Sequence, residues 1–184
     1  MKKIVVGITG ASGTVLAVKF LENINNAEIH LVVSDGAKKV MELETNYNIE
    51  YLKKLSSFYY EDSDIAARIS SGSFVFDTFI IIPCSSSTLA KIAAGISDTL
   101  ITRVATVAMK ERRKMIIVPR EMPFNTIMLE NMLKLSMNNV IVSPAIPGYY
   151  TKPSTMDDLL NFVVARILDL SGIENNISPR WKDA

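Results

Sequence analysis

The sequence predicts a single three-layer α/β domain over residues 1–184, in which helices cover both faces of a parallel β-sheet. Three observations indicate this fold. Five short apolar runs alternate along the chain with segments of helical pattern, as in a series of βα units. The runs are apolar at successive positions, which is typical of parallel strands buried on both faces. A length of 184 residues suits one well-packed domain and is short for two.

The N-terminal segment predicts a strand, a glycine turn and a helix in immediate succession. The strand is the run at 4–8, the turn contains Gly7, Gly10 and Gly13, and the helix extends to Leu21. Free N–H groups and the positive end of the helix dipole at such a turn favour an anion, most obviously phosphate. The G-x-x-G-x-x-G spacing differs from the G-x-G-x-x-G of a dinucleotide fold, so one phosphate group is the more economical interpretation. An ordinary tight turn with nothing bound is the alternative.

Two further strands end in hydroxyl side chains. The strand at 27–34 ends in Ser34, before a helix at 37–44. The strand at 76–83 precedes a helix at 89–94, and between them stand Cys84, Ser85, Ser86, Ser87 and Thr88. Because the carboxyl ends of parallel strands meet at one edge of the sheet, these hydroxyls are expected to contact a ligand there. Capping of the following helix is the alternative explanation.

The remaining segments carry weaker patterns. Residues 45–73 are mixed and predict an irregular excursion that includes a short helix. Two more strands and three more helices are expected at 98–113, 114–119, 125–137, 140–143 and 156–170. The first of these helices places Arg103 and Lys110 on one face. Its terminal Arg112 and Arg113 are expected to face water and offset the helix dipole.

Composition narrows the class of partner. The 20 Lys and Arg residues nearly balance the 19 Asp and Glu residues, which argues against nucleic acid or a membrane surface and favours a small molecule. The single cysteine, Cys84, excludes an internal disulfide and suggests a reducing compartment, so a cytoplasmic location is expected. No signal sequence and no apolar run of about 18 residues is apparent. An apolar content of 48% suggests surface buried between copies, and hence a homo-oligomer.

The polar residues at strand ends form the pattern of a mononucleotide site, for which FMN is a natural occupant, at Gly10 to Ser12, Ser34 and Ser85 to Thr88. A second set offers three cations and a phenol, enough to hold a second phosphate as substrate or leaving group, namely Lys110, Arg120, Tyr150 and Arg166. Glu44 and Glu121 lie at element ends, where they can exchange protons with a ligand. Taken alone, a surface or salt-bridge role is the simpler interpretation of each of these residues.

Several kinds of catalytic site are missing from the sequence. The only histidine, His30, lies inside the second strand, where its ring is expected to be partly buried and hydrogen-bonded, so a histidine acid or base is not expected. No H-E-x-x-H, C-x-x-C or acidic metal cluster occurs, which leaves metal-dependent catalysis without support. No G-x-S-x-G nucleophile elbow occurs either.

Nearly the whole chain resembles the flavin prenyltransferases of the UbiX/Pad family, once called aromatic acid decarboxylase small subunits. The matching motifs are "GITGASG" at 7–13, "LETNY" at 43–47, "DIAARISSGSF" at 64–74, "IIPCSSSTLAKIAAGISDTLITR" at 81–103, "KERRKMIIVPRE" at 110–121, "GYYTKP" at 148–153 and "RW" at 180–181. The resemblance implies a Rossmann-like flavoprotein domain that joins the dimethylallyl group of dimethylallyl phosphate to N5 and C6 of reduced FMN, without a metal. It also implies a dodecamer, and a UbiD-type decarboxylase as the recipient of the prenylated FMN.

Roles for individual residues follow from the matching motifs of that family. The implied FMN contacts are Gly10, Ala11, Ser12, Ser34, Ser85, Ser86, Ser87, Thr88, Arg103 and Arg120. The implied dimethylallyl phosphate contacts are Lys110, Arg120, Tyr150, Arg166 and Trp181, and the implied catalytic groups are Ser12, Glu44, Lys110 and Glu121. Val104, Thr106 and Met122 depart from the family pattern, which bears on local helix packing more than on catalysis.

Two other functions compete with this one. The FMN-dependent cysteine decarboxylases of a sister family need a catalytic histidine early in the chain and a "PASANT"-like loop where this chain has "PCSSST", and both features are missing. A non-enzymatic flavin carrier of the flavodoxin type needs neither the surplus cations nor Glu121. Such carriers usually have an acidic surface, which a net charge of +1 does not provide.

Overall fold

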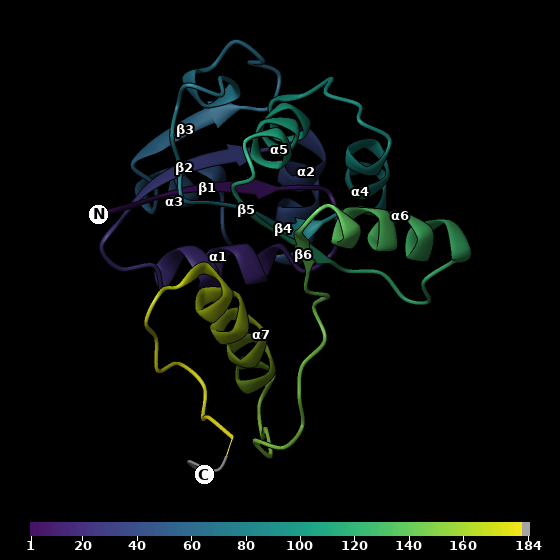
Figure 1. Cartoon of the computed structure of the whole chain (residues 1–184). Helices are drawn as coiled ribbons and strands as arrows, with labels where there is room; N and C mark the ends of the chain where they lie inside the picture. The colour runs from purple at the N-terminus through teal and green to yellow at the C-terminus, as the bar shows by residue number, and fades with distance from the viewer. Residues whose placement is uncertain (182–184) are drawn as a thin grey trace.

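The computed structural model describes residues 1–181, so the last three residues of the expected domain, 182–184, lie outside the described part of the chain. Its strands form one sheet with parallel pairing throughout, in the order β3-β2-β1-β4-β5-β6 (Figure 1). The strands are β1 (Lys2–Ile8), β2 (Ala27–Val33), β3 (Phe58–Glu61), β4 (Thr78–Cys84), β5 (Lys114–Pro119) and β6 (Val140–Val142). The strand order reverses between β1 and β4, and open α/β sheets bind ligands at the carboxyl ends of the strands beside such a reversal.

Short polar residues determine where most of the helices begin. The helices are α1 (Thr14–Glu22), α2 (Asp35–Glu44), α3 (Ile49–Lys54), the 3-10 turn η1 (Arg68–Ser70), α4 (Ser86–Ala93), α5 (Leu100–Lys110), α6 (Thr126–Met137) and α7 (Met156–Ser171). Each α-helix from α2 to α7 follows a Ser, Thr or Asn whose side-chain oxygen accepts a backbone N–H three residues on. Because α1, α2, α4 and α6 directly follow parallel strands, their N-termini lie at the carboxyl edge of the sheet.

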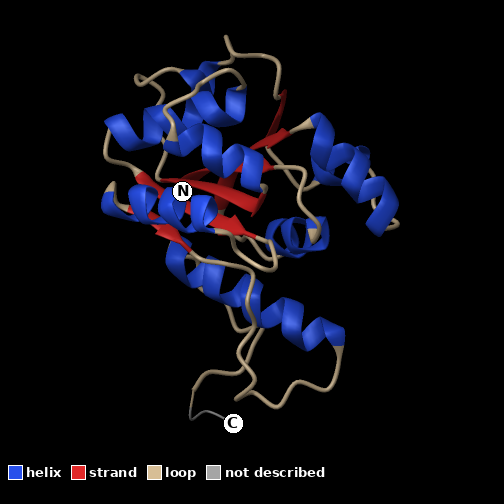
Figure 2. Ribbon diagram, turned by 90° about the vertical axis from the view of Figure 1, so that its right-hand side faces the viewer, coloured by secondary structure: helices blue, strands red, loops and turns tan. Residues whose placement is uncertain are grey.

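The sheet separates two hydrophobic cores, which confirms the three-layer prediction. Ile4, Val6 and Ile8 of β1 point into a core shared with α1, α2, α3 and α7. Val5 points to the other face, where α4, α5 and α6 supply the apolar side chains. Figure 2 shows these helices packed on both sides of the strands. Burial on both faces is the reason that the strands read as continuous apolar runs in the sequence.

The excursion at 45–73 contains a sixth strand that the sequence analysis missed. β3 pairs with β2 at the edge of the sheet, with Phe58 opposite His30 and Glu61 opposite Val33. Four residues of mixed polarity give too short a pattern to indicate a strand, and only the pairing with β2 defines it. α3 was likewise not predicted. The short helix expected at 64–73 is present only as the three residues of η1, with turns on both sides of it.

Two expectations about basic and aromatic side chains had different outcomes. The expected hydrogen bonds of His30 are present, with Nε2 2.8 Å from a Glu28 carboxylate oxygen and Nδ1 2.9 Å from the Tyr60 hydroxyl, but its ring is fully and not partly buried. The prediction that Arg113 faces water was wrong. Its guanidinium donates to the backbone oxygen of Phe74 at 2.6 Å and to that of Gly72, tying the loop before β4 to the end of α5.

Candidate functional site at the carboxyl edge of the sheet

The glycine turn after β1 is packed directly against the start of α2. A Cβ atom added at Gly10 would lie 3.1 Å from the Gly36 backbone, so the two segments approach as closely as main chains can. The Ser34 N–H donates to the Ile8 oxygen at 3.0 Å, which holds the end of β2 beside the turn. Gly7 is a different case from Gly10. It lies within β1 against Ile101 and Phe79, so it contributes to packing of α5 and not to the turn.

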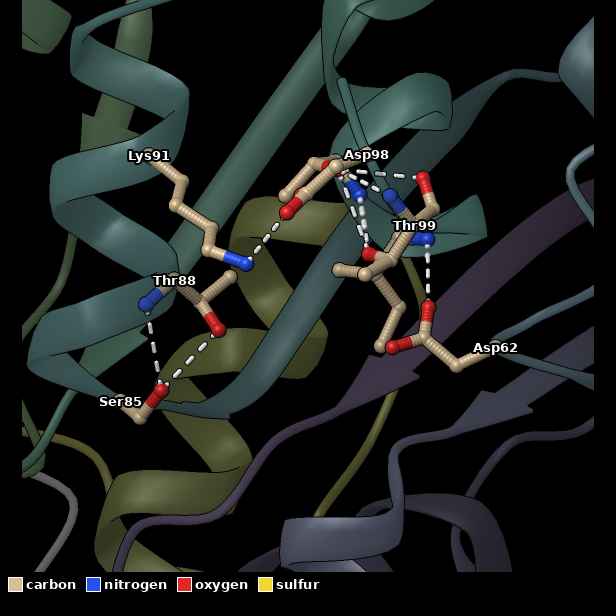
Figure 3. Close-up of polar contacts among 8 residues, drawn as sticks. Asp62, Ser85, Thr88, Lys91, Asp98 and Thr99 are labelled. Carbon is tan, nitrogen blue, oxygen red and sulfur yellow. Dashed lines mark hydrogen bonds and ion pairs between the residues drawn. The ribbon is translucent and has the colours of Figure 1, made fainter. Parts of the chain in front are cut away.

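The hydroxyl-rich segment after β4 forms the second turn at this edge. Ser85 is the N-cap of α4, and its Oγ accepts the Thr88 N–H at 3.3 Å and donates to the Thr88 hydroxyl at 3.0 Å (Figure 3). Ser86 and Ser87 begin α4 and are not fully buried. Capping therefore explains the Ser85 side chain, whereas the next hydroxyls and N–H groups of this helix start remain available to an anion. One turn further along α4, Lys91 pairs with Asp98 at 2.7 Å, which joins α4 to the segment before α5 (Figure 3).

Two side chains from elsewhere in the sequence close on the first turn. The Gly13 N–H donates to Glu44 Oε2 at 2.8 Å, so the end of α2 reaches the start of α1. Arg120 follows β5 and its Nε donates to the Ser12 oxygen at 3.1 Å. The structure therefore places the predicted residues after β1, β2 and β4 at one edge of the sheet. Glu44 and Arg120 join them there.

An apolar cavity opens beside Arg120. It has a volume of about 400 Å³ and is lined mainly by prolines and apolar side chains of the segments after β5 and β6, from Pro119 to Phe124 and from Pro144 to Tyr149. Glu121 lines the same cavity, and its Oε1 accepts the Met122 N–H at 3.2 Å. A flat apolar ring fits walls of this kind, with a guanidinium and a carboxylate at its border.

Arg103 and Lys110 lie near opposite ends of α5. Arg103 Nε donates to the Ser70 oxygen at 3.3 Å, and Lys110 Nζ pairs with Glu111 at 2.6 Å beside Gly72. Lys110 ends α5, and β5 begins four residues later, so Lys110 lies at the amino edge of the sheet. A single chain therefore does not bring Lys110 to the carboxyl edge.

Tyr150, Trp181 and Arg166 form a third group, on α7 and the segments beside it. The Tyr150 and Trp181 rings meet edge to face with centres 5.0 Å apart, and Tyr150 packs on Phe162 in the same way at 5.6 Å. Arg166 lies one helical turn after Phe162 and pairs with Asp169 at 3.0 Å. Figure 1 shows the segment between β6 and α7 extending away from the sheet together with the C-terminal tail.

Sequence reasoning missed three residues that organise these groups. Thr9 is buried and bonds to both Pro83 and Ser85, Gly36 provides the close approach to Gly10, and Asp169 binds the tail to α7. The Asp-Gly pair at a strand end was a usable signal for Gly36. Thr9 and Asp169 have long-range partners that no local pattern indicates.

The cysteine beside the second turn is not a nucleophile. Burial raises the pKa of the Cys84 thiol to about 12, so the thiolate is scarce at neutral pH. Within residues 1–181, no group of three or more His, Cys, Asp or Glu side chains is placed to share a metal ion. Over the same residues, no helix has both the length and the apolarity to cross a bilayer.

Comparison with known proteins agrees with this geometry. A family model described as Flavoprotein matches residues 1–168. A flavin prenyltransferase UbiX from Thermoplasma acidophilum is 59% identical over 97% of this chain and 99% of its own length. A dodecameric FMN-dependent UbiX-like decarboxylase from Escherichia coli O157:H7 has a TM-score of 0.96 and 48% identity, covering 98% of this chain and 99% of its own. AnUbiX (PadA1), solved in complex with FMN and dimethylallyl pyrophosphate, has a TM-score of 0.96 and 39% identity, covering 98% and 97%.

The parallel sheet, the close glycine turn at the strand reversal and the matching family model define the class of this protein as a flavoprotein. Its relatives narrow that class. At up to 59% identity over nearly full length, the chain belongs to the UbiX family of flavin prenyltransferases, which confirms the resemblance seen in the sequence motifs.

Proposed function

We propose that this protein transfers the dimethylallyl group of dimethylallyl phosphate to N5 and C6 of reduced FMN. The observation that carries the proposal is the carboxyl edge itself, where two glycine- and serine-rich helix starts meet Arg120 and an apolar cavity. The N–H groups of the helix starts suit the phosphate of FMN, and the cavity suits a flat ring system. These residues therefore fit FMN, with contacts from Gly10, Ala11, Ser12, Ser34, Ser85, Ser86, Ser87, Thr88 and Arg120.

The cations support the chemistry of the donor. Reduced FMN, when bound, supplies the electron-rich N5 and C6 atoms to which carbon is added. The C–O bond of the donor breaks and phosphate departs with the electron pair, so preorganised cations are needed around its oxygens. Arg120, Lys110 and Arg166 provide such cations, and Tyr150 adds a hydroxyl donor. Exclusion of water from an apolar cavity strengthens each of these interactions.

Carboxylates at the same edge suit proton movement. Glu44 already accepts the Gly13 N–H and lies beside Ser12, and Glu121 borders the cavity. Two protons leave the flavin positions where the new carbon bonds form, and one proton is added to the prenyl chain, so nearby acceptors and donors are required. We assign Ser12, Glu44 and Glu121 to this proton handling, with Lys110 acting on the departing phosphate.

We propose that the groups on α5 and α7 reach the flavin edge of neighbouring copies in a dodecamer. Lys110 lies at the opposite edge of its own sheet, and no hydrogen bond or ring contact within residues 1–181 joins the α7 group to the carboxyl edge. Large apolar side chains are exposed on α6, on the segment leading to α7 and at the first residue of α7, namely Leu129, Leu133, Met137, Ile146, Tyr149 and Met156. Contacts between copies would cover this surface. Under this proposal, Arg103, Lys110, Tyr150, Arg166 and Trp181 complete a site that one chain only begins.

The reaction is tested with purified protein, reduced FMN and dimethylallyl phosphate under anaerobic conditions. Mass spectrometry of the released flavin should show one added C5H8 unit together with free phosphate, and a chelator should not diminish either. The diphosphate donor is tried in parallel. An unmodified flavin with both donors would contradict the proposal, and release of carbon dioxide from a cysteine-containing peptide would support the sister family.

Sharing of residues between copies is tested by mixing two inactive variants. Lys110→Ala and Arg120→Ala subunits are co-expressed with different tags, and the mixed assemblies are purified on both. If the two residues of one site come from different chains, about a quarter of the sites are intact and activity returns. Mixed assemblies as inactive as each variant alone would show that one chain supplies both residues.

We further propose that a UbiD-type decarboxylase receives the product, and that the protein works in the cytoplasm. A single buried cysteine and the absence of any disulfide in residues 1–181 suit a reducing compartment. Incubation of the prenylation mixture with an apo-decarboxylase should restore decarboxylation, whereas unmodified FMN should not. Failure of the authenticated product to activate the decarboxylase would overturn the assignment of the recipient alone.

A further inference from the structure

We propose that Thr9 is a positioning residue that sets the separation of the two flavin-binding turns. Thr9 follows β1, is 2% exposed and precedes the glycine turn by one residue. Its hydroxyl donates to the Pro83 oxygen at 2.9 Å and accepts the Ser85 N–H at 2.7 Å. One hydroxyl thus uses its donor and an acceptor site to join the two turns. The inference rests on the proposed use of both turns to hold FMN.

The surrounding backbone explains why a side chain is needed at this point. The ladder between β1 and β4 is regular from Ile4 opposite Thr78 to Gly7 opposite Ile81. Beyond that pair, β4 has a register irregularity before Cys84 on its other side, toward β5. The strand ends therefore lack regular pairing on the approach to the site. The Thr9 N–H to Pro83 oxygen bond, at 3.2 Å, and the two hydroxyl bonds continue the connection.

The Ser85 N–H is the functional end of this connection. Ser85 caps α4, so the position of its backbone determines where the first N–H groups of α4 point. The backbone carbonyl oxygen of Thr9 also accepts the Ala11 N–H at 2.8 Å, and this bond shapes the first turn. Thr9 therefore contacts both anion-binding segments and needs no contact with FMN itself. Valine at this position keeps the shape of the side chain and leaves the Ser85 N–H without its acceptor.

The experiment compares Thr9→Val with Thr9→Ser and with Thr78→Val as a matched control. Thr78 is an equally buried threonine on β4, at the amino end of the strand. The dissociation constant for FMN, from quenching of flavin fluorescence, should rise about 10–100-fold in Thr9→Val, because a polar group loses its partner in the site. Thr9→Ser should stay within about threefold of the parent, and Thr78→Val within about twofold, since neither disturbs the connection.

Two further measurements separate positioning from general stability. In a double-mutant cycle, the losses of FMN affinity from Thr9→Val and Ser85→Ala should be less than additive, because both act through the start of α4. In the parent apo-protein, the Ser85 amide should exchange its hydrogen as slowly as the amides of β4, a readout that stands even if Thr9→Val fails to fold.

Three results would overturn the inference: unchanged FMN affinity in folded Thr9→Val, equal losses in Thr9→Ser and Thr9→Val, or fast exchange of the Ser85 amide. These readouts concern FMN binding and the apo-protein. A protein that bound FMN but failed to prenylate it would thus contradict the proposed reaction and leave the role of Thr9 standing.

Discussion

Replacement of Asp169 by asparagine should weaken use of the prenyl donor while leaving FMN binding intact. The Asp169 carboxylate accepts from Arg180 Nη2 at 2.9 Å and from Arg166 at 3.0 Å, and Asn175 Nδ2 lies 3.0 Å from the same group. Arg180 precedes Trp181, whose ring contacts Tyr150. Asp169 therefore holds in place the tail that carries Trp181, which is predicted to contact the dimethylallyl donor. It also pairs directly with Arg166, a second predicted contact of that donor.

The expected magnitude follows from exposure and pairing. Hydrogen bonds to charged groups contribute about 1.5–3 kcal/mol when buried. The side chains of Arg166 and Arg180 are 54% and 41% exposed, so solvent screening reduces the loss to about 1–2 kcal/mol in total. For a chain of this size the melting temperature should fall by about 2–8 °C. Loss of an aromatic contact worth about 0.5–1.5 kcal/mol should raise the KM for dimethylallyl phosphate about 2–10-fold.

The assay measures the donor KM, the FMN dissociation constant and the melting temperature for Asp169→Asn and for Asp157→Asn. Asp157 is the matched control, since it also lies on α7 but pairs with Lys19 of α1, at 2.8 Å. The control should leave the donor KM unchanged. A donor KM that stays constant or falls in Asp169→Asn, despite a lower melting temperature, would refute the reasoning and leave Asp169 with a structural role only.

Three other predictions concern the flavin edge, the donor cations and the buried histidine. Gly10→Ala should reduce FMN affinity at least about tenfold, because the new methyl group meets the Gly36 backbone and pushes the turns apart; fluorescence titration that shows parental affinity would disprove this. Lys110→Ala should keep its FMN and lose about 100-fold in kcat, whereas Ser34→Ala should purify with less FMN; the opposite pattern would exchange the two assignments. His30→Gln should keep near-parental turnover. Burial lowers the pKa of His30, opposed by its bond to Glu28, so the unfolded chain takes up a proton before the folded chain does, and stability declines as pH falls through about 6.5. Thermal melts across that range should show a smaller decline in His30→Gln, and identical declines would count against the buried neutral ring.

The sequence by itself determined the layers and most of the carboxyl edge. Buried parallel strands produce continuous apolar runs, and βα units place the residues after each strand at one edge, so the positions of Gly10, Ser34, Ser85 and Arg120 followed from local pattern alone. The position of His30 inside a strand also followed from local pattern, whereas its full burial depends on β3, which pairs with β2 and places Phe58 opposite His30.

Tertiary structure decided which distant groups meet. Thr9 and Ser85 are 76 residues apart, and Arg120 and Ser12 are 108 apart, so nothing in a local window indicates either bond. β3 exists only because β2 offers it an edge to pair with. These features depend on the geometry of the assembled sheet. Periodicity and propensity indicate which face of a helix or strand a residue lies on, but they do not indicate its contact partner. Only the structure therefore shows which hydrogen bonds hold together the turns at the carboxyl edge.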